Sequence, residues 1–95
     1  MSAANAAIND LILALESTDE SDRCCAIEDL GLLKDRDTIP YLIKAIDDGS
    51  TRVREASIDA LISIGGNGVV TEMILLLESE DVSLRNAAIN ILEQL

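Results

Sequence analysis

The chain has 95 residues, of which 18 are acidic and 7 basic, for a formal net charge of −11; 48% of its residues are hydrophobic and Tyr41 is the only aromatic one. We therefore expect one domain with an aliphatic core. The acidic balance argues against a nucleic-acid surface, which needs clustered Lys and Arg, and against an anionic membrane surface for the same reason.

No segment has the length and apolar character of a membrane span, and no basic region precedes the first apolar residues, so no signal peptide is expected. Cys24 and Cys25 are adjacent, which is poor geometry for a structural disulfide. Reduced thiols and a cytoplasmic setting are the expectation.

Residues 6–38 predict two helices and a loop. A first helix is expected to end near Ser17, and Asp19 is placed to cap a second helix, because its side chain can accept from the free amides of the first turn. Residues 34–37 read as a charged loop, and Thr38 as the cap of the next helix. The apolar positions with helical spacing are Ile8, Leu11, Ile12 and Leu15, then Cys25, Ala26, Ile27, Leu30 and Leu33.

Residues 39–69 repeat this design. Pro40 falls in a first turn, where its missing N–H costs little, Gly49 allows a sharp reversal, and Ser50 is placed to cap the following helix. The segment Gly65–Gly68 predicts a loop, because successive glycines stop a helix. The apolar or small positions are Ile39, Leu42, Ile43 and Ile46, then Val53, Ala56, Ser57, Ala60, Leu61 and Ile64.

Residues 70–95 repeat it once more, with Asp81 as the expected cap and apolar positions at Val70, Met73, Ile74 and Leu77, then Leu84, Ala87, Ala88, Ile89, Leu92 and Leu95. A shift of 31 residues superposes the three segments, and seven triplets of positions, such as 27/58/89, are apolar in all of them. One helix pair cannot bury both its own stripe and its stacking face. We predict an all-α fold, a short right-handed α-solenoid of three antiparallel helix pairs in one domain, residues 1–95, with repeats 8–38, 39–69 and 70–95.

The segment Ile46–Gly65 resembles the core of a HEAT-like repeat of the short type first described in phycobilisome lyase subunits, with the pattern L-x-D-x-(D/S)-x-x-V-R-x-x-A-x-x-A-L-x-x-I-G. The resemblance covers about residues 8–95 and implies the fold, whereas such repeats serve many unrelated roles. The first unit departs from the pattern with Asp22 in place of Val. The matching residues outside the central unit are Asp19, Arg23, Ala26 and Leu30, then Asp81, Leu84, Arg85, Ala88, Ile91 and Leu92.

Each unit carries one arginine near its turn, where acidic residues also gather. The resemblance implies a ladder of structural ion pairs between neighbouring units, and an anion site is the weaker alternative, because acids crowd the arginines. The residues of this expected ladder are Arg23, Arg54 and Arg85 with Asp19, Asp47, Asp48 and Asp81.

Catalysis is not expected, because the chain has no histidine and no nucleophile beside a base. Nearby carboxylates such as Glu55 and Asp59 need a pocket that raises one pKa, which a solenoid surface does not offer. No cofactor and no metal site are expected either, since no loop has calcium-binding spacing. Cys25 aligns with Ala56 and Ala87, so we expect it in the core, with Cys24 exposed.

The outward side of the second helices is the expected partner surface, a mildly acidic groove for a protein or peptide with a basic surface. A solvated face without a partner is the alternative. The residues of this predicted ridge are Cys24, Glu28, Glu55, Asp59, Ile62, Asn86, Asn90 and Glu93.

The last unit has apolar residues on more than one side, at Leu75, Leu76 and Ile89–Leu95. We expect this face to be covered by a second copy of the chain or by sequence beyond it. The leading functional prediction is a protein-interaction scaffold or assembly module without catalysis. The resemblance also implies two alternatives: an accessory subunit of a bilin lyase or phycobilisome-related enzyme, or a part of a longer HEAT-repeat protein.

Overall fold

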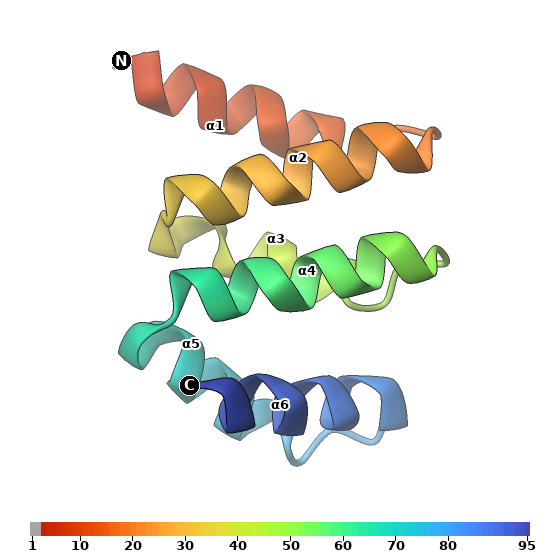
Figure 1. Ribbon diagram of the computed structural model, residues 1–95, viewed down its shortest axis with the longest axis vertical. Coiled ribbons are helices and arrows are strands. Elements are labelled where there is room, and N and C mark those ends of the chain that lie inside the picture. The colour runs from red at the N-terminus through yellow and green to blue at the C-terminus, as the bar shows by residue number, and fades with distance from the viewer. Residues whose placement is uncertain (1–2) are drawn as a thin grey trace.

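The structure, a computed structural model, describes the backbone of residues 3–95 and the side chains of residues 7–95 (Figure 1). Its regular elements are all helical, which confirms the predicted fold of three helix pairs. They are α1 (Ala3–Ala14), α2 (Glu20–Leu33), the 3-10 helix η1 (Arg36–Thr38), α3 (Ile39–Ala45), α4 (Thr51–Ile64), α5 (Gly66–Leu76) and α6 (Val82–Gln94).

The helices form two layers. Figure 1 shows α2, α4 and α6 side by side, each lying across the long axis of the molecule and stacked one after another along it, with α3 and α5 behind them and α1 at the end next to α2. Each first helix packs against the second helix of its own pair, and α2 packs closely against α4. The second helices therefore form the layer that joins one unit to the next.

Three predicted helix starts have the expected caps. The side chain of Asp19 accepts from the Ser21 amide at 2.8 Å, that of Ser50 from Val53 at 3.4 Å, and that of Asp81 from Ser83 at 2.9 Å. Each cap satisfies an amide that has no partner within the helix and is worth about 1 kcal/mol. All three lie at the same edge of the stack, where the second helices begin.

Two local predictions were wrong. Thr38 does not cap α3, because its hydroxyl donates to the carbonyl of Asp35 at 2.6 Å, and residues 36–38 form a 3-10 turn. The four-residue glycine loop is also absent, since α5 begins at Gly66 and only Gly65 separates it from α4. Both Gly65 and Gly66 have positive φ, so the reversal still depends on glycine.

The core is an aliphatic spine that runs through all three units. Its side chains come from both layers, and burying each one fully contributes about 1.5–3 kcal/mol relative to exposure. The largest fully buried hydrophobic side chains are Ile27, Leu30, Leu42, Ile46, Val53, Leu61, Val69, Met73 and Ile91.

The two junctions between second helices differ. A Cβ placed on Gly31 would lie 3.0 Å from the Cα and Cβ of Ala60, so α2 and α4 approach almost to backbone contact. The equivalent positions at the next junction hold Ile62 and Ile91, whose larger side chains keep the helices apart. Accordingly α4 and α6 share less contact, and Figure 1 shows a wider spacing between them.

The expectation that Ile89 is buried was wrong. Its equivalent Ile27 is 0% exposed, whereas Ile89 is 46% exposed, because this position faces away from α4, on a side of α6 where no other described helix packs. Ile91 is the buried isoleucine of α6 instead. Leu33 and Leu95, at another predicted apolar position, are also exposed.

Candidate functional site

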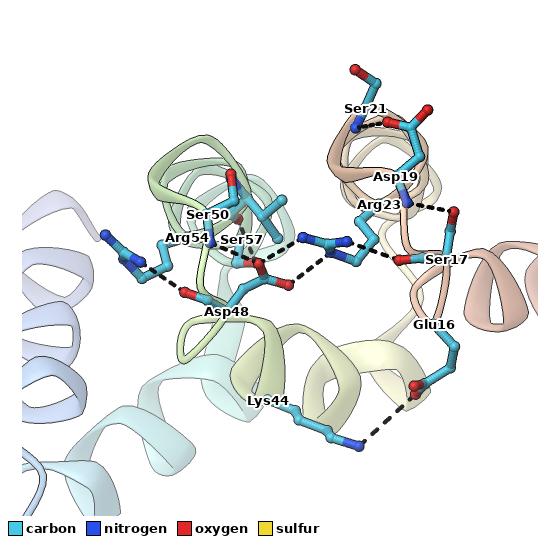
Figure 2. Close-up of polar contacts among 11 residues, drawn as sticks. Glu16, Ser17, Asp19, Ser21, Arg23, Lys44, Asp48, Ser50, Arg54 and Ser57 are labelled. Carbon is cyan, nitrogen blue, oxygen red and sulfur yellow. Dashed lines mark hydrogen bonds and ion pairs between the residues drawn. The ribbon is translucent and has the colours of Figure 1, made fainter.

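The first junction contains a two-point ion pair (Figure 2). Arg23 Nε donates to Asp48 Oδ2 at 3.0 Å, and Arg23 Nη2 donates to Asp48 Oδ1 at 3.1 Å. The third donor, Nη1, reaches the carbonyl oxygen of Ser17 at 2.8 Å. One guanidinium therefore ties the turn of its own unit to the turn of the next unit, in the fork geometry that favours arginine over lysine.

This contact shifts the pKa of both partners. Partial burial alone would raise the pKa of Asp48, but hydrogen bonds from Arg23 and from the Ser50 amide outweigh it, and the pKa lies below its ordinary value. The hydrogen bond to Asp48 raises the pKa of Arg23. Both shifts favour the charged forms, so the pair remains ionised at neutral pH.

Arg54 and Arg85 do not continue this pairing. Arg54 Nη1 donates to the carbonyl of Asp48 at 2.7 Å, and Arg85 Nη1 donates to that of Ser79 at 2.6 Å, the same bond that Arg23 makes to Ser17. Within the side chains that the structure describes, neither has an acidic group within 4.0 Å. Arg54 and Arg85 therefore each stabilise only the turn of their own unit.

The predicted ladder therefore needs correction. It has one rung, Arg23–Asp48, because the residue 31 positions after Asp48 is Ser79, which has no carboxylate for Arg54. Asp19 and Asp81 act as helix caps, and Asp47 is exposed. Two outer pairs, Lys44–Glu16 and Arg52–Glu20, are both 3.9 Å long and exposed, so each contributes at most about 1 kcal/mol.

The predicted ridge lies on α2, α4 and α6. Ile62 on α4 is half-buried, and Cys24 on α2 is buried. The other six residues of the ridge are exposed: Glu28, Glu55, Asp59, Asn86, Asn90 and Glu93.

The assignment of the two cysteines was reversed. Cys24 is 5% exposed and Cys25 is exposed, and both thiols are free. Cys24 lies one heptad before Gly31, on the stripe of α2 that packs against α4, whereas its equivalent Glu55 faces the wider second junction and is exposed. Burial raises the pKa of the Cys24 thiol, and its hydrogen bond to Glu28 Oε1 (3.5 Å) raises it further.

A groove runs between α2 and α4 on the ridge side. It encloses about 340 Å³, its floor consists of small residues, and an acidic side chain stands on each helix, Glu28 on α2 and Asp59 on α4. The exposed Leu32 lies at its edge, a residue that sequence reasoning missed. The floor is made of Gly31, Ala56, Ala60 and Ser63.

The floor of this groove is held by direct contact between the helices. Ser63 Oγ donates to the carbonyl of Gly31 at 3.4 Å, next to the close approach of Gly31 and Ala60. Gly31 is the signal that could have located the groove, since the equivalent positions hold Ile62 and Glu93. A glycine at a helix junction permits a spacing that no larger residue allows.

We next considered metal sites and membrane spans among the described residues. Between residues 7 and 95, no three His, Cys, Asp or Glu side chains lie together as a metal site would require. None of the helices from α1 to α6 has the length and apolar character needed to cross a bilayer.

Three stacked helix hairpins joined through their second helices define an α-solenoid repeat protein. Residues 8–94 match the family of HEAT repeats, so the chain belongs to the HEAT-repeat family. HEAT repeats generally mediate protein interactions or serve as scaffolds. No curated protein matches the chain.

Proposed function

We propose that this chain is a protein-interaction scaffold whose α2–α4 groove binds a cationic, partly aliphatic segment of another protein. The observation that carries the proposal is the combination of acidic walls, Glu28 and Asp59, with an apolar floor formed by Gly31 and Ala60. A peptide of such composition could place aliphatic side chains on the floor and basic groups beside the walls.

The charge on the second-helix layer supports a cationic partner. Helices α2, α4 and α6 carry seven exposed acidic residues and one exposed basic residue, Arg52, which already lies 3.9 Å from Glu20. A surface with one dominant sign of charge attracts an oppositely charged partner and speeds their association. The exposed Leu32 adds apolar contact at the groove edge.

We further propose that the scaffold acts in the cytoplasm and without catalysis of its own. The two free thiols support a reducing compartment. The sequence contains no histidine, the commonest general acid–base residue.

The proposal is tested by affinity capture from the native cell with matched variants. The double variant Glu28→Gln/Asp59→Asn removes both acidic walls while keeping the side-chain shapes. The control Asp10→Asn/Glu72→Gln removes the same charge from exposed positions on the first helices. We expect the groove variant alone to lose the proteins that co-purify with the wild type; equal recovery by both variants would contradict the proposed groove.

A second function, as an accessory subunit of a bilin lyase or related phycobilisome enzyme, is favoured by one feature. A hollow of about 650 Å³ opens between α1 and α3, and this is the size of a small-molecule pocket. Its lining combines aliphatic side chains and Tyr41 with five charged residues, Glu16, Arg23, Lys44, Asp47 and Asp48. Titration with a free bilin tests it. A shifted absorbance spectrum that is lost in Leu13→Glu, on the pocket wall, would support this role, and an unchanged spectrum would exclude it.

A further inference from the structure

We infer that the exposed end of the third unit binds a second copy of this chain, so that two chains associate end to end through the same face. This end face consists of Ile74 and Leu77 on α5 and Arg85 and Ile89 on α6, and the exposed polar residues Asn86 and Glu93 border it. The inference does not depend on the proposed function, because the groove residues of α2 and α4 are not part of the end face.

The first unit identifies which residues make such a face. On its side of the junction with the second unit, Ile27 is fully buried and Arg23 pairs with Asp48, while Ile12 and Leu15 border the hollow beside them. Each of these four positions of the first unit has an equivalent 31 residues later in the second unit and 62 residues later in the third. The equivalents in the third unit are Ile74, Leu77, Arg85 and Ile89. The end face therefore corresponds to a surface that packs against another unit elsewhere in the same molecule.

The aliphatic side chains of the end face are more exposed than the equivalent side chains of the first two units. Ile46 is 2% exposed in the second unit, whereas Leu77 at the same position of the third unit is 40% exposed. Ile89 shows the same contrast with Ile27, and Ile74 is also exposed. Large aliphatic side chains clustered on one face of a solenoid end normally receive a cap or a partner.

The opposite end of the stack is a poor partner for this face. Where α4 presents Val53 and Ala60 toward α2, the outer side of α2 presents Asp22 and Asp29, both exposed. Head-to-tail stacking of two chains would place these carboxylates against aliphatic side chains such as Ile89 and leave them unpaired. This disfavours an open filament and favours pairing of like faces, the arrangement of a two-fold dimer.

The rim of the end face carries charges of both signs. Arg85 has no acidic side chain within 4.0 Å among the described side chains, while Glu78, in the turn after α5, and Glu93, on α6, are exposed. In the first unit the equivalent arginine, Arg23, reaches across the junction to a carboxylate. A two-fold pairing offers Arg85 of each copy an acid of the other.

The size of the end face suits a reversible dimer. The molecule measures 36 × 28 × 19 Å, and its units stack along the longest dimension, so the end measures about 28 by 19 Å (Figure 1). Pairing across the whole of this end would bury at most roughly 500 Å² on each copy, or ~1,000 Å² in total, which is the lower limit for specific interfaces. We therefore expect dissociation on dilution.

Sedimentation velocity over a range of concentrations tests the dimer. The wild type should move from monomer to dimer and no further as concentration rises, and Leu77→Glu should stay monomeric. The control Leu33→Glu changes a leucine of the first unit that is 47% exposed and lies outside the end face, and it should dimerise like the wild type. Circular dichroism confirms folding of each variant. A wild type that is monomeric throughout, growth beyond the dimer, or equal effects of both variants would overturn the inference.

Spin labels determine which ends meet. A label on the exposed Cys25 lies in the first unit, and a label on Glu93→Cys in a Cys25→Ser background lies in the third. Pairing through the end faces predicts a short distance between the two Glu93→Cys labels and a long or undetectable one between the two Cys25 labels. The reverse order of distances would overturn the inference.

Discussion

Arg23 in the first unit donates two hydrogen bonds to the carboxylate of Asp48 in the second unit, and no equivalent pair joins the second unit to the third. The same junction brings Gly31 against Ala60, while the next junction holds Ile62 and Ile91. The first two units therefore form the more tightly joined part of the stack, and the third is attached through a wider contact.

Supplying the missing carboxylate should strengthen the second junction. Ser79→Asp places an acid at the position equivalent to Asp48, toward Arg54, and is expected to raise the free energy of unfolding by about 0.5–1 kcal/mol. Urea unfolding measures the change. The gain should disappear in an Arg54→Met background; if it persists there, it comes from something other than the new pair.

Removing the existing pair should destabilise the chain in a pH-dependent way. Because the pKa of Asp48 is lowered in the folded state, its contribution is present above the ordinary aspartate value of about 4 and is lost as the pH falls through the lower, folded-state pKa. Asp48→Asn should therefore lower the thermal midpoint at pH 7 by a few degrees and have little effect near pH 2.

The neighbouring substitution Asp47→Asn is the control, since Asp47 is exposed and makes no ion pair within 4.0 Å in the described part of the chain. It should change the thermal midpoint little at neutral pH. A difference between wild type and Asp48→Asn that is as large in acid as at pH 7 would show that the pair is not its source.

Because α2 and α4 approach so closely, we expect that replacing Gly31 with a larger residue destabilises the fold. Gly31→Ala puts a methyl group 3.0 Å from Ala60, so the helices must separate, at a cost of about 1–3 kcal/mol in urea unfolding. Gly49→Ala is the matched control, because a Cβ there meets nothing within 4 Å, and its effect should lie within about 0.5 kcal/mol. Equal costs at both positions would mean that the junction is looser than described.

The two cysteines should differ in reactivity. Cys25 is exposed, whereas Cys24 is buried with a raised pKa, so a maleimide should label the Cys24→Ala variant rapidly and the Cys25→Ser variant only when it unfolds. Mass spectrometry at timed intervals reports both rates. Rapid labelling of native Cys25→Ser would place the Cys24 thiol at the surface.

Much of the fold could be predicted from the sequence because each helix carries its own periodic apolar stripe and cap. Asp19, Ser50 and Asp81 begin their helices as expected, since capping depends on residues within one turn. The glycine loop was wrong because packing of α5 extends its helix back to Gly66 despite the low helix propensity of glycine.

The candidate site was predicted less well because it depends on distances between units. The orientation of Cys24 follows from the narrow α2–α4 spacing, which the alignment with Glu55 conceals. The sequence could have predicted that only one ion pair of the ladder forms, since Ser79, the equivalent of Asp48 in the third unit, has no carboxylate. Gly31 is the sequence signal for the groove, but the partner that it contacts, Ala60, is identified only by the structure.

The most direct test of the central claim is an amide NMR titration with a short peptide of alternating lysine and leucine as the probe. The account predicts that saturable shift changes concentrate on the groove floor, at Gly31, Ala56, Ala60 and Ser63, and weaken in Glu28→Gln/Asp59→Asn. Shift changes spread over the acidic residues of α1, α3 and α5, or no saturable change at all, would contradict it.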